Sequence, residues 1–180
     1  MQGDTFKRNN IHNDLSRFDD NSVDVLYAIE TIVHNSDKEN IFRQVKRILK
    51  PGGVAIVYDY GLKQSFESYE PVFQRAISIL KGPACDMIES FDELNTHFTN
   101  CGLQIEEADD YTRETLPDLK RLERLAAKVI ERPWLAKLSS WLLPDMFVVN
   151  IVIGYLGFDG ANGNIGSYYE WILRKPASSK

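Results

Sequence analysis

Three titratable side chains follow two apolar runs of the chain, at places where an α/β protein would carry chemistry. Glu30 and His34 come after the run Val23–Ile29, and Asp59 comes after the run that starts at Val54. A carboxylate or an imidazole beside a reacting group can take up or deliver its proton, which is general acid–base catalysis. Each residue also has a structural alternative: Glu30 can cap the backbone, His34 can be a satisfied loop histidine, and Asp59 can bridge to a neighbouring helix.

The segments around these residues predict a strand, a helix and a second strand. Val23–Ile29 is an almost continuous apolar run, typical of a strand inside a parallel sheet. The next segment, from about Asp37 to Leu49, has one apolar helical face and is followed by Lys50-Pro-Gly-Gly53, where proline and glycine stop a helix. Val54–Tyr60 then predicts the second strand. Strands connected in this way are almost always parallel, so the three titratable residues are expected at one crevice, at the carboxyl ends of the strands.

The same segments resemble class I S-adenosylmethionine-dependent methyltransferases. The resemblance rests on the order of an acidic residue, Asp14, a Phe-x-Asp-x-Ser-x-Asp turn at Phe18–Asp24, and an Arg-x-Leu-Lys-Pro-Gly-Gly turn at Arg47–Gly53. Tyr27-Ala-Ile-Glu30 with His34 is similar to the methyltransferase type 11 group, which includes sterol 24-C-methyltransferases and small-molecule relatives. The resemblance implies a Rossmann-like fold, S-adenosylmethionine as the cofactor, and a small, apolar, isoprenoid- or sterol-like substrate.

Four residues would contact the cofactor if the resemblance holds. Asp14 would accept a hydrogen bond from the adenine amino group, and Leu15 would lie beside the adenine ring. Ala28 and Ile29, at the end of the first strand, complete this expected set. The alternative for Asp14 is a turn carboxylate without a ligand.

Catalysis would fall on Glu30, His34 and Asp59, one of which would act as the base. Tyr58 and Tyr60 follow the second apolar run and would line the substrate site, where their ring faces could stabilise a developing cation. They could equally be aromatic residues of a strand.

The family's glycine-rich cofactor loop precedes the position of Asp14, and only thirteen residues precede Asp14 here. We therefore expect the sequence to correspond to the later two thirds of a methyltransferase, without the segment that cradles the methionine part of the cofactor. On that expectation the chain alone binds S-adenosylmethionine weakly or not at all, and a homodimer or a partner chain supplies the remaining strands. The alternative is a non-catalytic or half-enzyme subunit of a methyltransferase complex.

The whole sequence predicts a single domain over residues 1–175 and a disordered tail over residues 176–180. A capping box at Ser90–Glu93 opens a helix, and Leu103–Ala108 and Ser167–Leu173 predict two further strands. By resemblance the last strand is antiparallel to its neighbours. The predicted fold class is α/β, with a Rossmann-like, mostly parallel sheet flanked by helices.

Two insertions, about residues 61–89 and 112–157, lie outside the alternation of strands and helices. The resemblance implies that they form a lid and the substrate pocket. The second insertion is mostly helical in pattern and is interrupted at Pro133. It carries Trp134 and Trp141, which we assign to the substrate site, with packing in the core as the alternative.

Two neighbouring stretches near the end of the second insertion have contrasting patterns. Met146–Phe158 is 13 residues long, too short to cross a hydrocarbon layer of about 30 Å, and predicts a buried helix or a pocket wall. Contact with a lipid or a membrane surface is its alternative. Gly157–Gly166 has a glycine at every third position and predicts a flexible turn.

Composition excludes several classes of protein. A formal net charge of −5 argues against a nucleic-acid surface, because phosphate binding needs concentrated lysine and arginine. Cys85 and Cys101 lack the spacing of a metal site and predict a reduced, intracellular protein without a structural disulfide. The start of the sequence shows no signal-peptide pattern, so we expect a cytoplasmic location.

Overall fold

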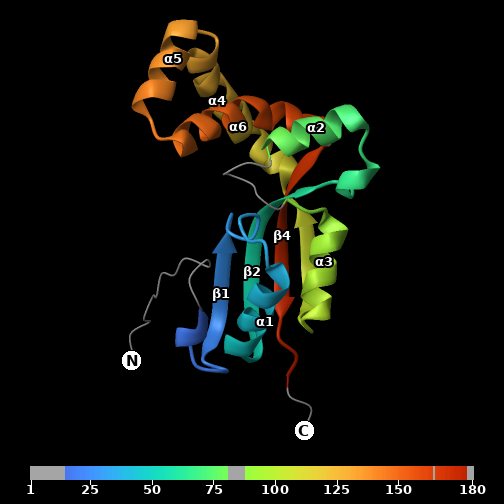
Figure 1. Cartoon of the computed structure of the whole chain (residues 1–180). Coiled ribbons are helices and arrows are strands. Elements are labelled where there is room, and N and C mark those ends of the chain that lie inside the picture. Colours follow the sequence, from blue (N-terminus) through green and yellow to red (C-terminus); the bar gives the residue numbers. More distant parts are fainter. Residues whose placement is uncertain (1–14, 81–87, 164, 178–180) are drawn as a thin grey trace.

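The computed structural model describes residues 15–80, 88–163 and 165–177 (Figure 1). It has a four-stranded sheet with helices on it, and a group of helices beyond one end of the strands. The strands are β1 (Val23–Ile29), β2 (Leu49–Leu62), β3 (Gln104–Asp110) and β4 (Gly166–Arg174). The helices are α1 (Lys38–Ile48), α2 (Pro71–Leu80), α3 (Phe91–Asn100), α4 (Thr112–Ile130), α5 (Pro133–Leu142) and α6 (Asp145–Asn162), and two 3₁₀ turns are η1 (Leu15–Arg17) and η2 (Phe66–Ser68). Asp14, Cys85 and residues 178–180 of the expected tail lie outside the described residues.

The strands lie in the order β1-β2-β4-β3. β1 and β2 are parallel, and β4 is antiparallel to both β2 and β3, as expected for the last strand. The predicted α/β class, with a mostly parallel sheet flanked by helices, is therefore confirmed: β1, β2 and β3 run in the same direction, and β4 alone opposes them in the described sheet. Because β4 lies between β2 and β3, it creates two antiparallel pairings and makes the sheet mixed.

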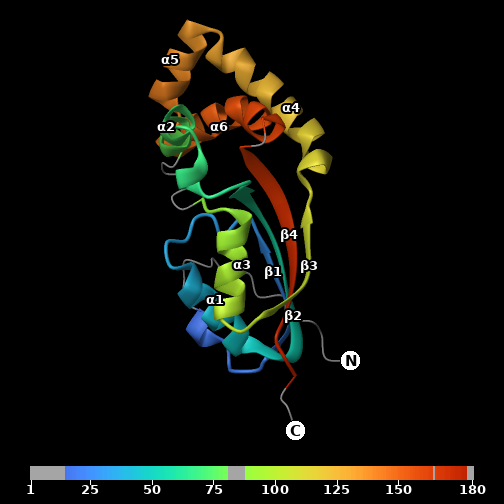
Figure 2. The same cartoon turned by 90° about the vertical axis from the view of Figure 1, so that its right-hand side faces the viewer.

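Helices α1 and α3 cover the same face of the sheet (Figure 2). Between them and the strands lies the main apolar core, in which the rings of Phe42 and Phe98 meet edge to face with centroids 4.5 Å apart. Trp171 on β4 is fully buried there, and its indole Nε1 donates to Asn95 Oδ1 at 2.9 Å. A large aromatic residue is thus buried with its one polar group satisfied, which is the stable way to bury tryptophan.

Helices α1 and α3 begin where the sequence predicts. Asp37 caps α1 by accepting a hydrogen bond from the Asn40 N–H, and Ser90 and Glu93 form the expected capping box of α3. The end of α1 differs slightly from the prediction: Leu49 is already extended, and the Lys50–Gly53 turn is part of β2. Gly52 has φ of +79°, a conformation that favours glycine, so this turn still depends on its glycine.

The glycine-rich stretch after Met146–Phe158 is helical where a turn was expected. Helix α6 continues to Asn162, through Gly157 and Gly160. It packs along α4, where Gly154 faces the Cβ atoms of Leu122 and Ala126. Tertiary packing of this kind overrides the low helix propensity of glycine. Across the described residues, none of the helices has the length and apolar character needed to cross a membrane.

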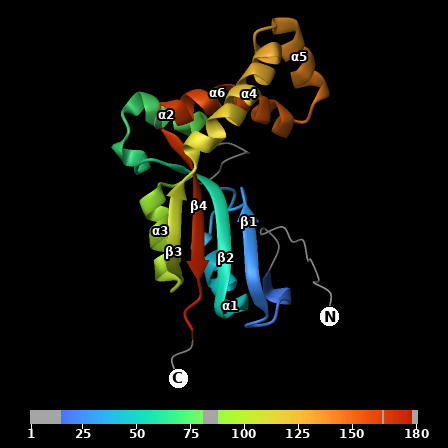
Figure 3. The same cartoon turned by 180° about the vertical axis from the view of Figure 1, so that it is seen from behind.

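The face of the sheet opposite α1 and α3 has no helix over it among the described residues (Figure 3). Val25, Tyr27 and Ile29 of β1 point to this face and are exposed by 50%, 66% and 58%. β1 is also an edge strand. An apolar face next to an unpaired strand edge is a surface that native proteins normally cover.

Arg47 connects the start of the described chain to α1. Its guanidinium donates to the carbonyl oxygens of Leu15 (2.9 Å) and Phe18 (2.8 Å) and to the carboxylate of Asp20 (2.5 Å). The fork of arginine suits three such acceptors, which a single ammonium group cannot match.

We expect Arg47→Ala to lower the free energy of unfolding by about 1–3 kcal/mol, because two partly buried carbonyls and one carboxylate lose a charged donor. Arg43→Ala is the matched control, since Arg43 lies on the same helix and is exposed. Urea denaturation followed by circular dichroism measures both variants. Equal denaturation midpoints for the two variants would show that the Arg47 contacts contribute nothing.

Candidate functional site

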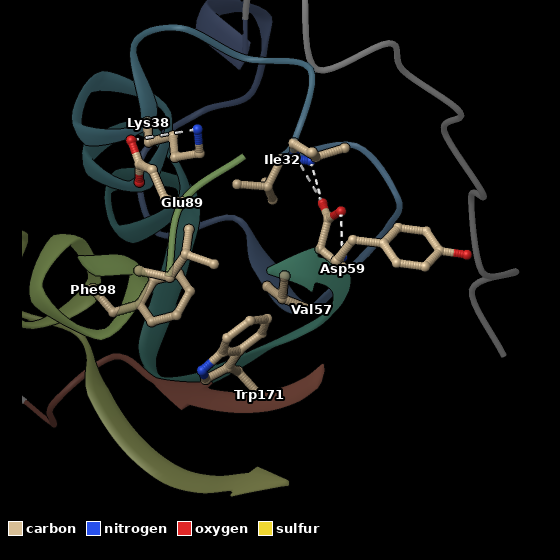
Figure 4. Close-up of a pocket in the computed structure, with 10 residues that line it drawn as sticks. Ile32, Lys38, Val57, Asp59, Glu89, Phe98 and Trp171 are labelled. Atoms are coloured by element: carbon tan, nitrogen blue, oxygen red, sulfur yellow. Dashed lines mark hydrogen bonds and ion pairs between the residues drawn. The ribbon is translucent and has the colours of Figure 1, made fainter. Parts of the chain in front are cut away.

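The loop after β1 is fixed by one buried carboxylate, that of Asp59 on β2. Asp59 is 1% exposed, and its Oδ2 accepts hydrogen bonds from the backbone N–H groups of Ile32 (2.6 Å) and Val33 (3.1 Å) (Figure 4). Its Oδ1 accepts from the Tyr60 N–H at 2.8 Å. Both oxygens are thus occupied by backbone donors, and the loop is tied to the end of β2.

Asp59 was expected to open into the crevice as part of the catalytic set, and its geometry gives it a different task. Burial raises the pKa of Asp59, as does the nearby charge of Glu30, whereas the three N–H donors act in the opposite direction. A carboxylate enclosed in this way is a positioning group for the loop. The sequence alternative, a bridge to a neighbouring helix, is also not what forms, because the partners are backbone groups of the loop itself.

Glu30, the first residue of that loop, has its side chain exposed and its backbone constrained. Its φ of +49° lies in the left-handed region, and its N–H donates to the Tyr58 carbonyl at 2.8 Å. A non-glycine residue held there costs about 1–3 kcal/mol and is found most often at functional positions. The Tyr168 hydroxyl donates to Glu30 Oε1 at 3.4 Å. His34 is half-buried in the same loop, four residues further on.

Four tyrosines gather beside Glu30 on the face of the sheet that carries no described helix. The rings of Tyr58 and Tyr168 are stacked with centroids 6.4 Å apart, and Tyr60 meets Tyr168 edge to face at 4.8 Å. The ring of Tyr111, just after β3, has its centroid 6.4 Å from that of the Tyr58 ring. The Tyr58 hydroxyl donates to Glu170 Oε1. We call these four tyrosines with Glu30 and Glu170 the tyrosine–glutamate cluster.

The two carboxylates hold the protons on their tyrosine neighbours. The hydrogen bond to Glu170 raises the pKa of Tyr58 to about 12, with burial and the charge of Glu170 adding to it. Burial raises the pKa of Tyr168 to about 12, with the charge of Glu30 as the next cause. Both hydroxyls therefore remain protonated hydrogen-bond donors at neutral pH.

This arrangement favours a cationic ligand or intermediate. Tyrosine ring faces attract cations, and two adjacent carboxylates add a negative potential. Glu30 is the exposed group that can accept a proton. Among the described residues, no set of three or more histidine, cysteine, aspartate or glutamate side chains is arranged to hold a metal ion.

A second group of charged residues lies on the other face of the sheet, under α1 and α3. The Lys38 ammonium is buried and lies 3.6 Å from Glu89 Oε1 (Figure 4). His97 Nε2 lies 3.0 Å from Glu89 Oε2. Lys38 and Glu89 border a hollow together with Val57 and Trp171, but the side chains leave no room in it for a water molecule. The group therefore links the start of α1 to α3 and is not a ligand pocket.

The remaining predicted residues fall at different places. Leu15 and Ala28 are buried in the main core, whereas Ile29 is exposed on the uncovered face. Trp134 and Trp141 are on α5, far from the end of β1 in Figure 1, and both are exposed. The structure thus brings Glu30, Tyr58 and Tyr60 together but does not bring the two tryptophans to them.

Sequence reasoning missed three members of the cluster: Tyr111, Tyr168 and Glu170. The segment that contains Tyr168 and Glu170 was read only as a closing strand. A signal was present, because the antiparallel register sets Glu170 opposite Tyr58 and Tyr168 opposite Tyr60. Directly opposed residues of paired strands share a face, so pairing the predicted strands residue by residue would have found two of the three.

Comparison with known proteins finds similarity to methyltransferases. Residues 2–57 match the "Methyltransferase domain" family. A sterol 24-C-methyltransferase of Aspergillus fumigatus is 34% identical over 90 residues, which cover 49% of this chain and 24% of that protein. The chain thus spans about a quarter of the length of this curated relative.

Solved structures share the fold at low sequence identity. A putative sarcosine dimethylglycine methyltransferase from Galdieria sulphuraria superimposes with a TM-score of 0.65 at 19% identity, over 89% of this chain and 56% of that chain. Geranyl diphosphate C-methyltransferase from Streptomyces coelicolor, solved with Mg²⁺, geranyl diphosphate and S-adenosyl-L-homocysteine, gives 0.60 at 18% identity, over 89% of this chain and 50% of that chain. The expected resemblance to class I S-adenosylmethionine-dependent methyltransferases is confirmed for this partial chain.

The raised tyrosine pKa values give a measurable consequence. A pKa raised from 10.0 to about 12 in the folded state means that the Tyr58 hydrogen bond stabilises the fold fully below pH 10 and ceases to do so as the pH rises towards 12. We expect Glu170→Gln to shift part of the tyrosine ionisation to lower pH, because the neutral amide no longer holds the proton. Absorbance of tyrosinate during an alkaline titration measures the shift.

Glu114→Gln is the control for this titration, since Glu114 is exposed on α4 and takes no part in the cluster. Identical ionisation curves for wild type and Glu170→Gln would refute the Tyr58–Glu170 hydrogen bond.

Proposed function

We propose that this chain, which carries part of a class I S-adenosylmethionine-dependent methyltransferase, takes part in methyl transfer from S-adenosylmethionine to a small, apolar molecule of the isoprenoid or sterol type. The observation that carries the proposal is the tyrosine–glutamate cluster at the end of β1 and β2. The carboxyl ends of parallel strands are where open α/β sheets bind their ligands.

The chemistry of methyl transfer fits this cluster. The nucleophilic atom of the substrate attacks the methyl carbon of the sulfonium, and the electrons of the breaking S–C bond remain on sulfur. If the nucleophile is a carbon–carbon double bond, the product of this step is a carbocation that must lose a proton. In this proposal the ring faces of Tyr58 and Tyr168 stabilise the cation, and the Glu30 carboxylate, which lies beside Tyr168, accepts the proton. Holding the two reactants in line contributes the rest of the rate enhancement.

The described residues can supply part of a cofactor site. Ile29 is an exposed apolar side chain directly before Glu30, and such a side chain suits the face of an adenine ring. Asp14, the expected partner of the adenine amino group, lies outside the described residues. S-adenosylmethionine would supply the electrophilic methyl group, and Glu30 and the tyrosines would orient the substrate and hold the charge that develops on it.

We further propose that additional chain covers β1 in the active protein, either a second copy or a partner chain. Two observations support this: the apolar side chains of Val25, Tyr27 and Ile29 are exposed, and β1 is a sheet edge. The same observations fit a half-enzyme subunit. Sedimentation velocity measures the association, and Val25→Lys should weaken it, because a charge would enter an apolar contact. A strictly monomeric protein at high concentration would refute self-association, and titration with candidate partner chains then tests the second form.

For the chemistry, we expect Glu30→Gln to lower turnover by roughly 10²–10⁴-fold, the usual loss when a general base is removed. The amide has the same shape and keeps the backbone at the same φ, so the affinity for S-adenosylmethionine, measured by calorimetric titration, should change little. Glu67→Gln, at an exposed glutamate away from the cluster, serves as the control. Methyl transfer from labelled S-adenosylmethionine to prenyl diphosphates and sterols gives the turnover.

Unchanged turnover in Glu30→Gln would contradict the assignment of the base. Absence of any S-adenosylmethionine binding in the assembled protein would instead contradict the proposed reaction as a whole.

A further inference from the structure

Helix α5 exposes one continuous apolar face that includes two tryptophans. Trp134, Leu138, Trp141 and Leu142 follow the spacing i, i+4, i+7 and i+8, which puts them on one side of the helix. Trp134 is 67% exposed and Trp141 is 80% exposed. The opposite side of α5, with the half-buried residues 135, 136 and 139, is the side that packs against the protein. By contrast, the third tryptophan of the chain, Trp171, is fully buried.

The apolar surface continues beyond the end of α5. Leu143, in the turn, and Phe147, in the first turn of α6, are also exposed. We call the exposed side chains of Trp134, Leu138, Trp141, Leu142, Leu143 and Phe147 the α5 surface. Exposed apolar groups of this extent mark a binding surface in soluble proteins.

The segment that contains α5 and the preceding part of α4 has a charge opposite to that of the whole chain. Residues 119–143 contain six lysines and arginines and two glutamates, a net charge of +4 in a chain with a formal net charge of −5. Lys120 pairs with Glu123 at 2.7 Å and lies over the ring of Phe158 at 4.2 Å. The other five basic side chains are exposed: Arg121, Arg124, Lys128, Arg132 and Lys137.

We propose that the α5 surface docks on a lipid bilayer that contains anionic lipids, with Trp134 and Trp141 at the level of the headgroups. Tryptophan prefers that level because its ring is apolar while its N–H can remain hydrated. An amphipathic helix with tryptophan and leucine on one side and basic residues beside them binds in the plane of such an interface. Each basic residue near an anionic surface adds about 1 kcal/mol of attraction.

The charge also decides between a bilayer and a second copy of the chain. A symmetric contact through the α5 surface would bring two segments of charge +4 together, and like charges across an interface disfavour association. An anionic bilayer offers the complementary charge instead. The α5 helix lies at the far end of the helical group from the sheet in Figures 1 and 3, so docking there leaves the tyrosine–glutamate cluster accessible.

This inference goes beyond the proposed methyl transfer and does not depend on it. It also relocates the membrane contact that the sequence suggested. The apolar stretch Met146–Phe158 lies in α6, which packs along α4, whereas the exposed tryptophans are on α5. Binding would be peripheral, because α5 is only ten residues long.

The test uses the whole protein and vesicles of phosphatidylcholine, with or without phosphatidylserine. We expect co-sedimentation with the anionic vesicles, a blue shift of tryptophan emission, and quenching by brominated lipid chains. Trp171 is fully buried, so the change comes from Trp134 and Trp141. Neutral vesicles or high salt should weaken binding, because the basic residues then lose their partners.

Two variants and one control make the test specific. Trp134→Ala combined with Trp141→Ala should lower the partition coefficient by about tenfold or more, and Lys137→Glu should lower it by roughly tenfold, because it exchanges an attractive for a repulsive charge. Tyr27→Ala is the matched control, since Tyr27 is an aromatic residue exposed by 66% on the uncovered sheet face. Circular dichroism checks that the variants fold.

Binding to anionic vesicles that is lost in the tryptophan and lysine variants but kept in Tyr27→Ala would support the proposal. Absence of vesicle binding would overturn it, as would binding that the double tryptophan variant retains. Dissociation of an oligomer by the tryptophan substitutions, without vesicle binding, would show that the α5 surface is a contact between copies and would also overturn the proposal.

Discussion

The Asp59 carboxylate holds the site together through backbone hydrogen bonds. Three N–H groups converge on its two oxygens, two from the loop after β1 and one from Tyr60. Hydrogen bonds to a buried charge are among the stronger ones in proteins, and loss of the acceptor would leave buried donors without partners. The position of Glu30, with its left-handed backbone, depends on this loop. Asp59 therefore fixes the loop that begins at Glu30.

The two faces of the sheet have different tasks because of the alternation along each strand. Ala55, Val57 and Asp59 of β2 point towards α1 and α3, whereas Tyr58 and Tyr60 point to the uncovered face. On the helix side the core is closed, and the Lys38–Glu89–His97 group there ties helices together. On the other side lie the tyrosine–glutamate cluster and the exposed residues of β1. The closed core and the candidate site thus lie on opposite faces of one sheet.

The helical group α4–α6 also has one closely packed side and one exposed side. The faces of α4 and α6 that meet each other are close-packed at Gly154, whereas α5 presents its tryptophans to solvent. The aromatic residues that the sequence placed over the substrate are consequently available for a different contact. A protein whose proposed substrate is apolar gains from a position at a membrane surface, where such molecules concentrate.

The sequence by itself determined the local elements and the family resemblance. β1 matches the predicted strand Val23–Ile29, the capping box begins α3 at the predicted residue, and the turn motifs around Asp24 and Lys50–Gly53 carried the resemblance that the comparisons confirmed. These features depend on periodicity, on capping and on glycine conformation, all of which are local. The direction of Asp59 was not predictable in this way, because it depends on donors in a loop 26 and 27 residues earlier in the chain.

Only the tertiary structure decided which distant residues share a site. Tyr58 meets Glu170 across 112 residues of sequence, and Glu30 meets Tyr168 across 138, because β4 inserts beside β2. The helical state of Gly157, which lies against Leu119 of α4, was also a tertiary outcome, since packing on α4 outweighs the low helix propensity of glycine. Strand register and helix packing depend on which elements lie next to each other. Local patterns in a single sequence predict each element, but they do not predict which elements pair.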